Sequence, residues 1–106
     1  MNLTENLLNL LRERGHRGEV VFSQHATARM IVRKIGSQEV FAALANACLV
    51  EDYPEAGYGP CCLLYGETAE LRPLHLVVSY PIRPTVRLIT VYEPNPAEWL
   101  SFTQRR

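Results

Sequence analysis

Three side chains that could bind and act on an anion are spaced four residues apart near the start of the chain. They are His25, Arg29 and Arg33, within residues 23–37, a stretch that reads as a helix. Residues at i, i+4 and i+8 of a helix lie in one column, so an imidazole and two guanidinium groups face the same way. The stretch contains no carboxylate to neutralise them, and neighbouring like charges do not stabilise a helix. The column, with Lys34 beside it, therefore predicts a site for an anion such as a phosphate.

RNA is a polyanion that such a column could both bind and cleave. Cleavage without a metal needs a base for the 2′-hydroxyl proton, an acid for the leaving 5′-oxygen, and cations that hold the transferring phosphate. Histidine suits both proton-transfer roles because its unperturbed pKa is about 6.5, and arginine suits the third because its planar guanidinium binds two oxygens at once. We therefore take His25 and His75 as the candidate acid–base pair and Tyr92 as a further proton donor. The candidate substrate-binding residues are Arg29, Arg33 and Lys34.

Each candidate also has a purely structural interpretation. His75 lies inside an apolar strand pattern, on the side predicted to face away from the helices, and can equally be a core histidine with its hydrogen bonds made by a neighbouring strand. His25 can be a helix-capping residue, and Tyr92 can be ordinary sheet packing. Three other tyrosines could stack on bases but equally suit packing: Tyr53, Tyr58 and Tyr65.

The charge distribution limits how nucleic acid could be contacted. Eleven basic and eleven acidic residues give a formal net charge of zero, whereas proteins that bind bulk nucleic acid are usually strongly basic. The charges are nevertheless segregated, because residues 16–34 are mostly basic and residues 50–70 contain acidic side chains but no Lys or Arg. Arg29 and Arg33 can be a solvated face or pair with Glu51, Asp52 or Glu55, and any nucleic-acid contact has to be local.

Length and composition are those of one globular domain. The chain has 106 residues, of which 47% are hydrophobic and 21% charged. No apolar run approaches the ~18 residues of a membrane span, and charged residues interrupt the N-terminal leucines, unlike in a signal peptide. We expect a cytoplasmic protein without membrane contact. The three cysteines suit neither a disulfide framework nor a zinc site. The weaker alternative is a metal site formed by Cys61, Cys62 and a distant histidine. We expect no metal or cofactor.

The apolar periodicity predicts helices first. Residues 2–14 carry leucines at helical spacing, and Gly15 and Gly18 are expected to end that helix. Residues 19–22 read as a short strand, and Ser23 as the N-cap of the next helix. The buried stripe predicted for that helix consists of Ala28, Met30, Ile31 and Ile35. Gly36 is expected to end it and Ser37 to cap a third helix, over about residues 38–47.

Strands follow the helices. The apolar period changes from 3.6 to 2, and four strands are predicted over about residues 48–53, 61–66, 74–80 and 86–92. Short loops between consecutive strands favour an antiparallel meander. Residues 97–102 are predicted to form a short helical tail anchored by Trp99 and Phe102. We therefore predict an α+β fold, with helices packed on one face of a four-stranded antiparallel sheet and the other face partly open for a ligand.

Four groups of residues, in this order, resemble the bacterial domain-of-unknown-function family 4258. They are the His25, Arg29 and Arg33 helix followed by Val40; Tyr53-Pro54; Arg72-Pro-Leu-His75; and Ile89-Thr-Val-Tyr92 followed by Pro94 and Trp99. The resemblance spans about residues 22–99. The family is similar to the RelE-like and barnase-like group of small ribonuclease toxins, which implies two helices packed on a four-stranded antiparallel sheet.

This resemblance also implies a function and a partner. It implies a metal-independent endoribonuclease, the toxin of a toxin–antitoxin pair, bound by a cognate antitoxin that is commonly a zinc-finger protein. Two features differ from typical toxins: the neutral charge, and an additional amphipathic helix that could dock a partner or form a homodimer. We accordingly divide the chain into an N-terminal helix, residues 1–18, and a single α+β domain, residues 19–106. The alternative function is a non-catalytic module that binds RNA or a protein.

Overall fold

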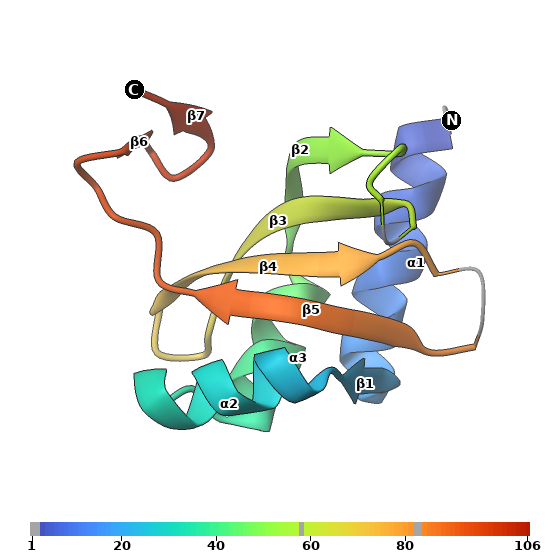
Figure 1. Ribbon diagram of the computed structural model, residues 1–106, viewed down its shortest axis with the longest axis horizontal. Helices are drawn as coiled ribbons and strands as arrows, with labels where there is room; N and C mark the ends of the chain where they lie inside the picture. Colours follow the sequence, from blue (N-terminus) through green and yellow to red (C-terminus); the bar gives the residue numbers. More distant parts are fainter. Residues whose placement is uncertain (1–2, 58, 82–83) are drawn as a thin grey trace.

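Helices precede the sheet in the chain, as the periodicity predicts. The structure, a computed structural model, describes residues 3–57, 59–81 and 84–106 (Figure 1). The three helices are α1 (Leu3–Arg17), α2 (Gln24–Arg33) and α3 (Ser37–Ala45), with the short strand β1 (Val20–Phe22) between the first two. The four predicted strands are confirmed as β2 (Cys48–Tyr53), β3 (Cys61–Glu67), β4 (Pro73–Ser79) and β5 (Val86–Tyr92). The predicted helix start at residue 2, and Tyr58, lie outside the described residues.

The sheet differs from the prediction by one strand. Its order is β1-β5-β4-β3-β2, and all neighbours are antiparallel except β1, which pairs in parallel with β5 from Val20↔Val86 to Phe22↔Leu88. The prediction of a four-stranded antiparallel sheet is therefore wrong, because the sheet has five strands and is mixed. A strand of three residues carries no local signal of its partner, and its partner here lies at the far end of the chain.

Helices α1 and α3 cover one face of the sheet (Figure 1). A Cβ on Gly66 of β3 would lie 1.9 Å from the carbonyl oxygen of Ala43, so glycine is required where α3 crosses the sheet. Gly15 does not end α1 as predicted but lies inside it, where a Cβ would come within 2.6 Å of the Ala45 nitrogen. The helix ends before Gly18, whose φ of +65° is left-handed. Leu11 of α1 is 1% exposed and belongs to the main core, so α1 packs as part of the fold.

Helix α2 buries a narrower side than predicted. Ala26 is fully buried, and Met30 and Ile35 pack on the core, but Ile31 is 74% exposed and Ala28 is exposed as well. The cause is the position of the helix, which lies along the edge of β5 instead of across the sheet face (Figure 1). A helix in that position can bury only the side that faces the strand.

The boundary between α2 and α3 also differs from the prediction. Helix α2 ends at Arg33, followed by Lys34 in the left-handed conformation with φ 55°, and does not continue to Gly36. Gly36 is the N-cap of α3 in place of Ser37. Its backbone N–H donates to the Glu39 carboxylate at 3.0 Å, a bond that lowers the pKa of Glu39.

The C-terminal segment forms a small hairpin where a helix was predicted. Strands β6 (Trp99–Leu100) and β7 (Gln104–Arg105) pair with each other and not with the main sheet. Ser101 and Phe102 have φ values of 51° and 64°, and two left-handed residues in succession reverse the chain instead of extending a helix. The predicted anchors are confirmed, because Trp99 is 4% exposed and Phe102 packs against Tyr65 with ring centroids 5.6 Å apart.

The hairpin covers part of the sheet face that points away from α1 and α3. None of the helices in the described ranges is long and apolar enough to cross a membrane.

Candidate functional site

Helix α2 takes over the edge of β5 at the point where β1 ends. Ser23, directly after β1, donates from its backbone N–H to the Leu88 oxygen at 3.1 Å. Its hydroxyl donates to the Ile89 oxygen at 3.0 Å and accepts from the Ala26 N–H at 2.9 Å, which confirms Ser23 as the N-cap. Two hydrogen bonds of Ser23 therefore fix the start of α2 to β5, and a third caps the helix.

The same strand edge orients the predicted cation column. Nη1 of Arg33 donates to the Val91 oxygen at 2.7 Å, so the end of α2 is also tied to β5. Arg29 and His25 lie one and two turns earlier on that face, and all three side chains are exposed. The column therefore runs along β5 in the order His25, Arg29, Arg33.

Two of the acidic residues offered as alternative partners of the column, Glu51 and Asp52, bind elsewhere. Glu51 pairs with Arg105, at 2.7 and 3.1 Å, and these bonds lower the pKa of Glu51. Asp52 accepts a hydrogen bond from the Tyr80 hydroxyl at 2.5 Å. Over the described ranges, Arg29 forms no ion pair. Its guanidinium is therefore available to an anion.

Lys34, the last predicted substrate-binding residue, has an exposed side chain and a backbone held by Arg72. Arg72 donates to the carbonyl oxygens of Lys34 at 2.9 Å and Arg33 at 3.0 Å, which closes the C-terminus of α2. It also pairs with Glu93 at 2.5 Å and with Glu39 at 3.2 Å, and these bonds raise its pKa. Sequence reasoning assigned Arg72 no role, and its role in the structure is to position α2.

A cavity of about 460 Å³ lies at the C-terminal end of β5, lined by Arg33, Arg72, Tyr92 and Glu93. Arg72 is shared by two carboxylates, Glu93 and Glu39, whereas Arg33 forms no ion pair within the described residues and donates to the neutral Val91 oxygen. Arg33 therefore presents to this cavity a positive charge that no described carboxylate binds directly. The cavity also brings Arg33 and Tyr92, two predicted site residues, together.

His75 lies on the same sheet face but is completely buried. Its Nε2 is 2.7 Å from the Phe102 carbonyl oxygen, which can only accept, so Nε2 carries the proton. In the neutral ring Nδ1 then accepts from the Tyr92 hydroxyl, 3.2 Å away. Burial lowers the pKa of His75 more than its bond to Phe102 raises it, and burial raises the pKa of Tyr92.

The C-terminal hairpin and two tyrosines of the sheet enclose His75. The Trp99 and Tyr92 rings meet its imidazole edge-on, with centroids 4.6 and 5.3 Å away, and Tyr65 lies at 6.2 Å. A substrate on this face can therefore reach Tyr92 but not His75 itself. Two of the three tyrosines proposed for base stacking are occupied within the fold, because Tyr65 packs on Phe102 and the Tyr53 hydroxyl donates to Glu51.

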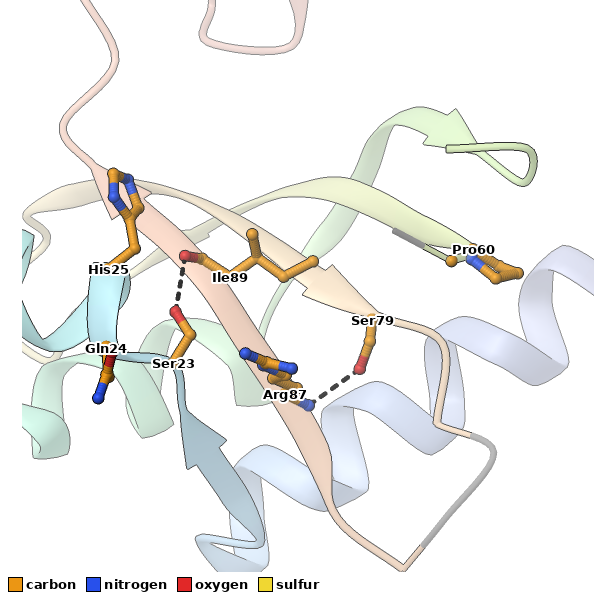
Figure 2. A pocket seen from close by; sticks show the side chains of 8 residues that line it. Ser23, Gln24, His25, Pro60, Ser79, Arg87 and Ile89 are labelled. Atoms are coloured by element: carbon orange, nitrogen blue, oxygen red, sulfur yellow. Dashed lines mark hydrogen bonds between the residues drawn. The ribbon is translucent and has the colours of Figure 1, made fainter. Parts of the chain in front are cut away.

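A second cavity, of about 390 Å³, lies at the other end of the column (Figure 2). Eight residues line it: Ser23, Gln24, His25, Gly59, Pro60, Ser79, Arg87 and Ile89. Strand β5 is bulged opposite Val77 and Val78, next to Ile89, and bulges commonly redirect side chains beside functional sites. Arg87 was not predicted, although an arginine that interrupts the apolar pattern of residues 86–92 is a readable sign of an exposed face.

The structure thus separates the two predicted proton-transfer histidines. His25 is exposed beside the second cavity, and His75 is buried beneath the hairpin. Tyr92 links His75 to the cavity near Arg33. The column and the Tyr92–His75 pair therefore form the candidate site, in which Tyr92 replaces His75 as the group that a substrate could contact.

Cysteine placement weighs against the weak metal alternative. Adjacent residues of a strand point to opposite faces, so Cys61 and Cys62 cannot both ligate one ion without distortion of β3. Both are buried, and burial raises the pKa of Cys62 to about 12. Within the part of the chain that the structure describes, no three His, Cys, Asp or Glu residues form a group that could hold a metal ion.

Comparison with known proteins gives a family but no relative of known activity. No curated protein and no solved structure matches the chain. Residues 22–93, which run from the last residue of β1 to the residue after β5, match the family described as domain of unknown function (DUF4258). This match covers more than half of the chain and includes the whole cation column and the Tyr92–His75 pair, so the chain belongs to the DUF4258 family.

Proposed function

We propose that this protein is a metal-independent endoribonuclease that cleaves single-stranded RNA lying along α2 and β5. One observation carries the proposal: the cation column, which forms no ion pair within the described residues, runs beside β5 toward a tyrosine that is hydrogen-bonded to a buried histidine. A column of arginines supplies phosphate binding, and a tyrosine backed by a neutral imidazole supplies a proton acceptor.

Arg29 is the proposed clamp for the scissile phosphate. His25 and Arg33 are two turns of α2 apart, about 12 Å along the axis, and Arg29 lies midway between them. Tyr92 shares a cavity with Arg33, so His25 and Tyr92 lie toward opposite ends of the column. Displacement at phosphorus places the attacking and leaving oxygens on opposite sides, which suits proton-transfer groups on either side of a phosphate held by Arg29.

Tyr92 is the proposed base in this scheme. Its hydroxyl already donates to Nδ1 of His75, so its oxygen lone pairs can accept the 2′-hydroxyl proton while its own proton passes to Nδ1. The 2′-oxygen then attacks phosphorus, and the bond from phosphorus to the 5′-oxygen breaks. His25, in its protonated form, donates to that 5′-oxygen. The products are a 2′,3′-cyclic phosphate and a 5′-hydroxyl end, and His75 is a positioning residue that acts through Tyr92.

Cleavage of a labelled single-stranded RNA in excess chelator tests the proposal. We expect cleavage by the wild type and losses of about 10²- to 10⁴-fold in kcat/KM for His25→Ala and Tyr92→Phe, the usual range for a lost acid or base. His16→Ala is the matched control, because His16 is also exposed but belongs to α1. Intact RNA with the wild type, or equal rates for the His25 and His16 variants, would refute the proposal.

His75→Gln separates positioning from chemistry in the same assay. Glutamine can keep the hydrogen bond to the Phe102 oxygen but cannot take the proton from Tyr92. We expect kcat to fall with KM nearly unchanged, and the basic side of the pH–rate profile to move toward the pKa of Tyr92 itself. A change in KM alone would assign His75 to packing.

A second candidate function is a non-catalytic module that binds a protein through α2. Ile31 and Val32 are 74% and 71% exposed, on the side of α2 away from β5, and exposed apolar side chains together favour a protein contact. An antitoxin encoded beside this protein is the partner that this candidate proposes. Ile31→Ser with Val32→Ser should abolish co-purification with that protein and leave the circular dichroism spectrum unchanged; unaltered co-purification would exclude this surface.

Homodimer formation through α1 remains a weaker proposal. Leu7 and Leu8 pack against the main core with Leu11, which leaves Leu10, at 40% exposure, as the most exposed leucine of the helix over its described side chains. Light scattering of wild type and Leu10→Ser tests it: a monomeric wild type would exclude the dimer.

A further inference from the structure

The cavity beside His25 has a composition that the cleavage chemistry alone does not require. It holds about 390 Å³, within the range of small-molecule sites, and lies between the start of α2, the end of the β2–β3 loop, the end of β4 and the first half of β5 (Figure 2). Phosphate binding needs only the exposed column. A hollow of this size next to the column has room for a group attached to the phosphate.

The polar groups of the cavity suit an anionic, hydrogen-bonding ligand. Arg87 and His25 approach it from β5 and α2, and its eight lining residues include no carboxylate. The Ser79 hydroxyl oxygen accepts from the Arg87 N–H at 3.0 Å, and over the described residues its own proton has no acceptor. Ser79 can thus donate to a ligand, whereas the Ser23 hydroxyl already donates to Ile89.

The cavity also offers apolar surface. Ile89 on β5 and Pro60 at the start of β3 are two of its lining residues, and Figure 2 shows both, with Arg87 and Ser79 between β5 and the end of β4. Apolar surface combined with an arginine and a hydroxyl suits a nucleobase and ribose, because a guanidinium plane can stack on the face of a base and a hydroxyl can bond to its polar edge.

We propose that this cavity is the subsite for the nucleotide that carries the leaving 5′-oxygen. The inference rests on the proposed function, in which His25 protonates that oxygen, because His25 itself lines the cavity. A phosphate held at Arg29 then has its downstream nucleoside beside His25, Ser79 and Arg87. Arg87 and Ser79 determine which downstream nucleotide is accepted.

Nucleoside 5′-monophosphates test the subsite without any cleavage, since their phosphate corresponds to the scissile one and their nucleoside to the downstream one. Amide chemical shifts are followed during titration with adenosine or uridine 5′-monophosphate and, separately, with inorganic phosphate. We expect at least one nucleotide to bind about three- to thirtyfold more tightly than phosphate, the gain expected from one or two additional hydrogen bonds. The largest shifts should fall on Ser79, Arg87 and Ile89.

Variants of the cavity residues test whether the cavity causes the tighter binding of the nucleotide. Arg87→Gln and Ser79→Ala should remove most of the preference for the nucleotide and leave phosphate affinity within about twofold, because neither belongs to the column. Arg17→Gln is the matched control, since Arg17 pairs with Glu13 on α1, at 2.7 Å, outside the cavity. Arg29→Ala should weaken nucleotide and phosphate alike.

The outcomes separate the subsite from the nuclease. Equal affinities for nucleotide and phosphate, no binding of either, or equal effects of Arg87→Gln and Arg17→Gln would overturn the subsite, even if RNA is cleaved. A nucleotide preference that depends on Arg87, in a protein that leaves RNA intact, would support the subsite and overturn the nuclease.

Discussion

The Arg33 side chain is hydrogen-bonded to the backbone oxygen of Val91, with Nη1 2.7 Å from that oxygen. Strand β1 ends opposite Leu88, so this part of β5 has no neighbouring strand on that side. Arginine therefore satisfies an edge carbonyl and, with its remaining N–H groups, still presents a positive charge to the cavity shared with Tyr92. One side chain thus serves both the fold and the candidate site.

The variants Arg33→Ala and Arg29→Ala should both bind RNA more weakly, but only Arg33→Ala should lower the free energy of unfolding. Arg33→Ala removes the bond to Val91, and we expect a loss of about 0.5–1.5 kcal/mol in the free energy of unfolding, the usual value of one hydrogen bond. Arg29→Ala removes no described bond, and its stability should stay within about 0.5 kcal/mol of wild type. Urea denaturation and RNA binding by fluorescence anisotropy measure the two effects; equal stability of both variants would contradict the role assigned to Arg33.

Folding stability should fall as the pH drops below about 6.5, the ordinary pKa of histidine. Burial holds the pKa of His75 below its usual value of 6.5, so just below that pH the unfolded chain binds a proton that the folded chain does not. The free energy of unfolding then decreases by at most about 1.4 kcal/mol per pH unit from this group, and the slope vanishes above its ordinary pKa. Urea denaturation at several pH values from about 5.5 to 7.5, roughly one unit either side of the ordinary histidine pKa, measures this slope.

His75→Gln should flatten that slope, whereas His16→Gln, at an exposed position of α1, should leave it unchanged. A slope that survives in the His75 variant would assign the pH dependence to other groups.

Trp99 should control access to His75. Its ring lies 4.6 Å from the imidazole and is 4% exposed, so Trp99→Ala should open the hairpin locally and expose His75. Diethylpyrocarbonate, which modifies accessible imidazoles, should modify His16 and His25 in the wild type and all three histidines in the variant, as mass spectrometry can count. Leu100→Ala, at the exposed neighbour of Trp99, is the control; rapid modification of His75 in the wild type would show that the hairpin does not cover it.

Two glycines should differ sharply in their tolerance of alanine. A Cβ on Gly66 would lie 1.9 Å from the Ala43 oxygen, a backbone atom that cannot move alone, so Gly66→Ala should lower the free energy of unfolding by about 1–3 kcal/mol or more. Gly57→Ala, with no atom within 4 Å of its added Cβ, should change it by less than about 0.5 kcal/mol. Thermal unfolding of both variants measures the difference, and equal melting temperatures would contradict the close packing of α3 on β3.

Strand positions were predicted from the sequence because their signal is local. Short runs rich in apolar residues, bounded by Pro and Gly, predict Cys48–Tyr53 and Val86–Tyr92, and the structure has these strands with the same bounds. The pairing of β1 was missed because hydrogen bonding between Val20 and Val86 depends on the path of the whole chain. The prediction of which side of α2 is buried was partly wrong for a similar reason. A helix beside a strand edge buries less of its surface than a helix that crosses a sheet face.

By itself, the sequence determined the order of the helices and main strands and the single column of His25, Arg29 and Arg33, because a helical repeat places residues four apart on one face. Only the tertiary structure decided which titratable groups meet. It buried His75 under the hairpin, joined it to Tyr92 and brought Arg87 beside His25, because each of these contacts joins segments that are distant in the chain. Chain spacing cannot encode such contacts, and they determine which groups a substrate can reach.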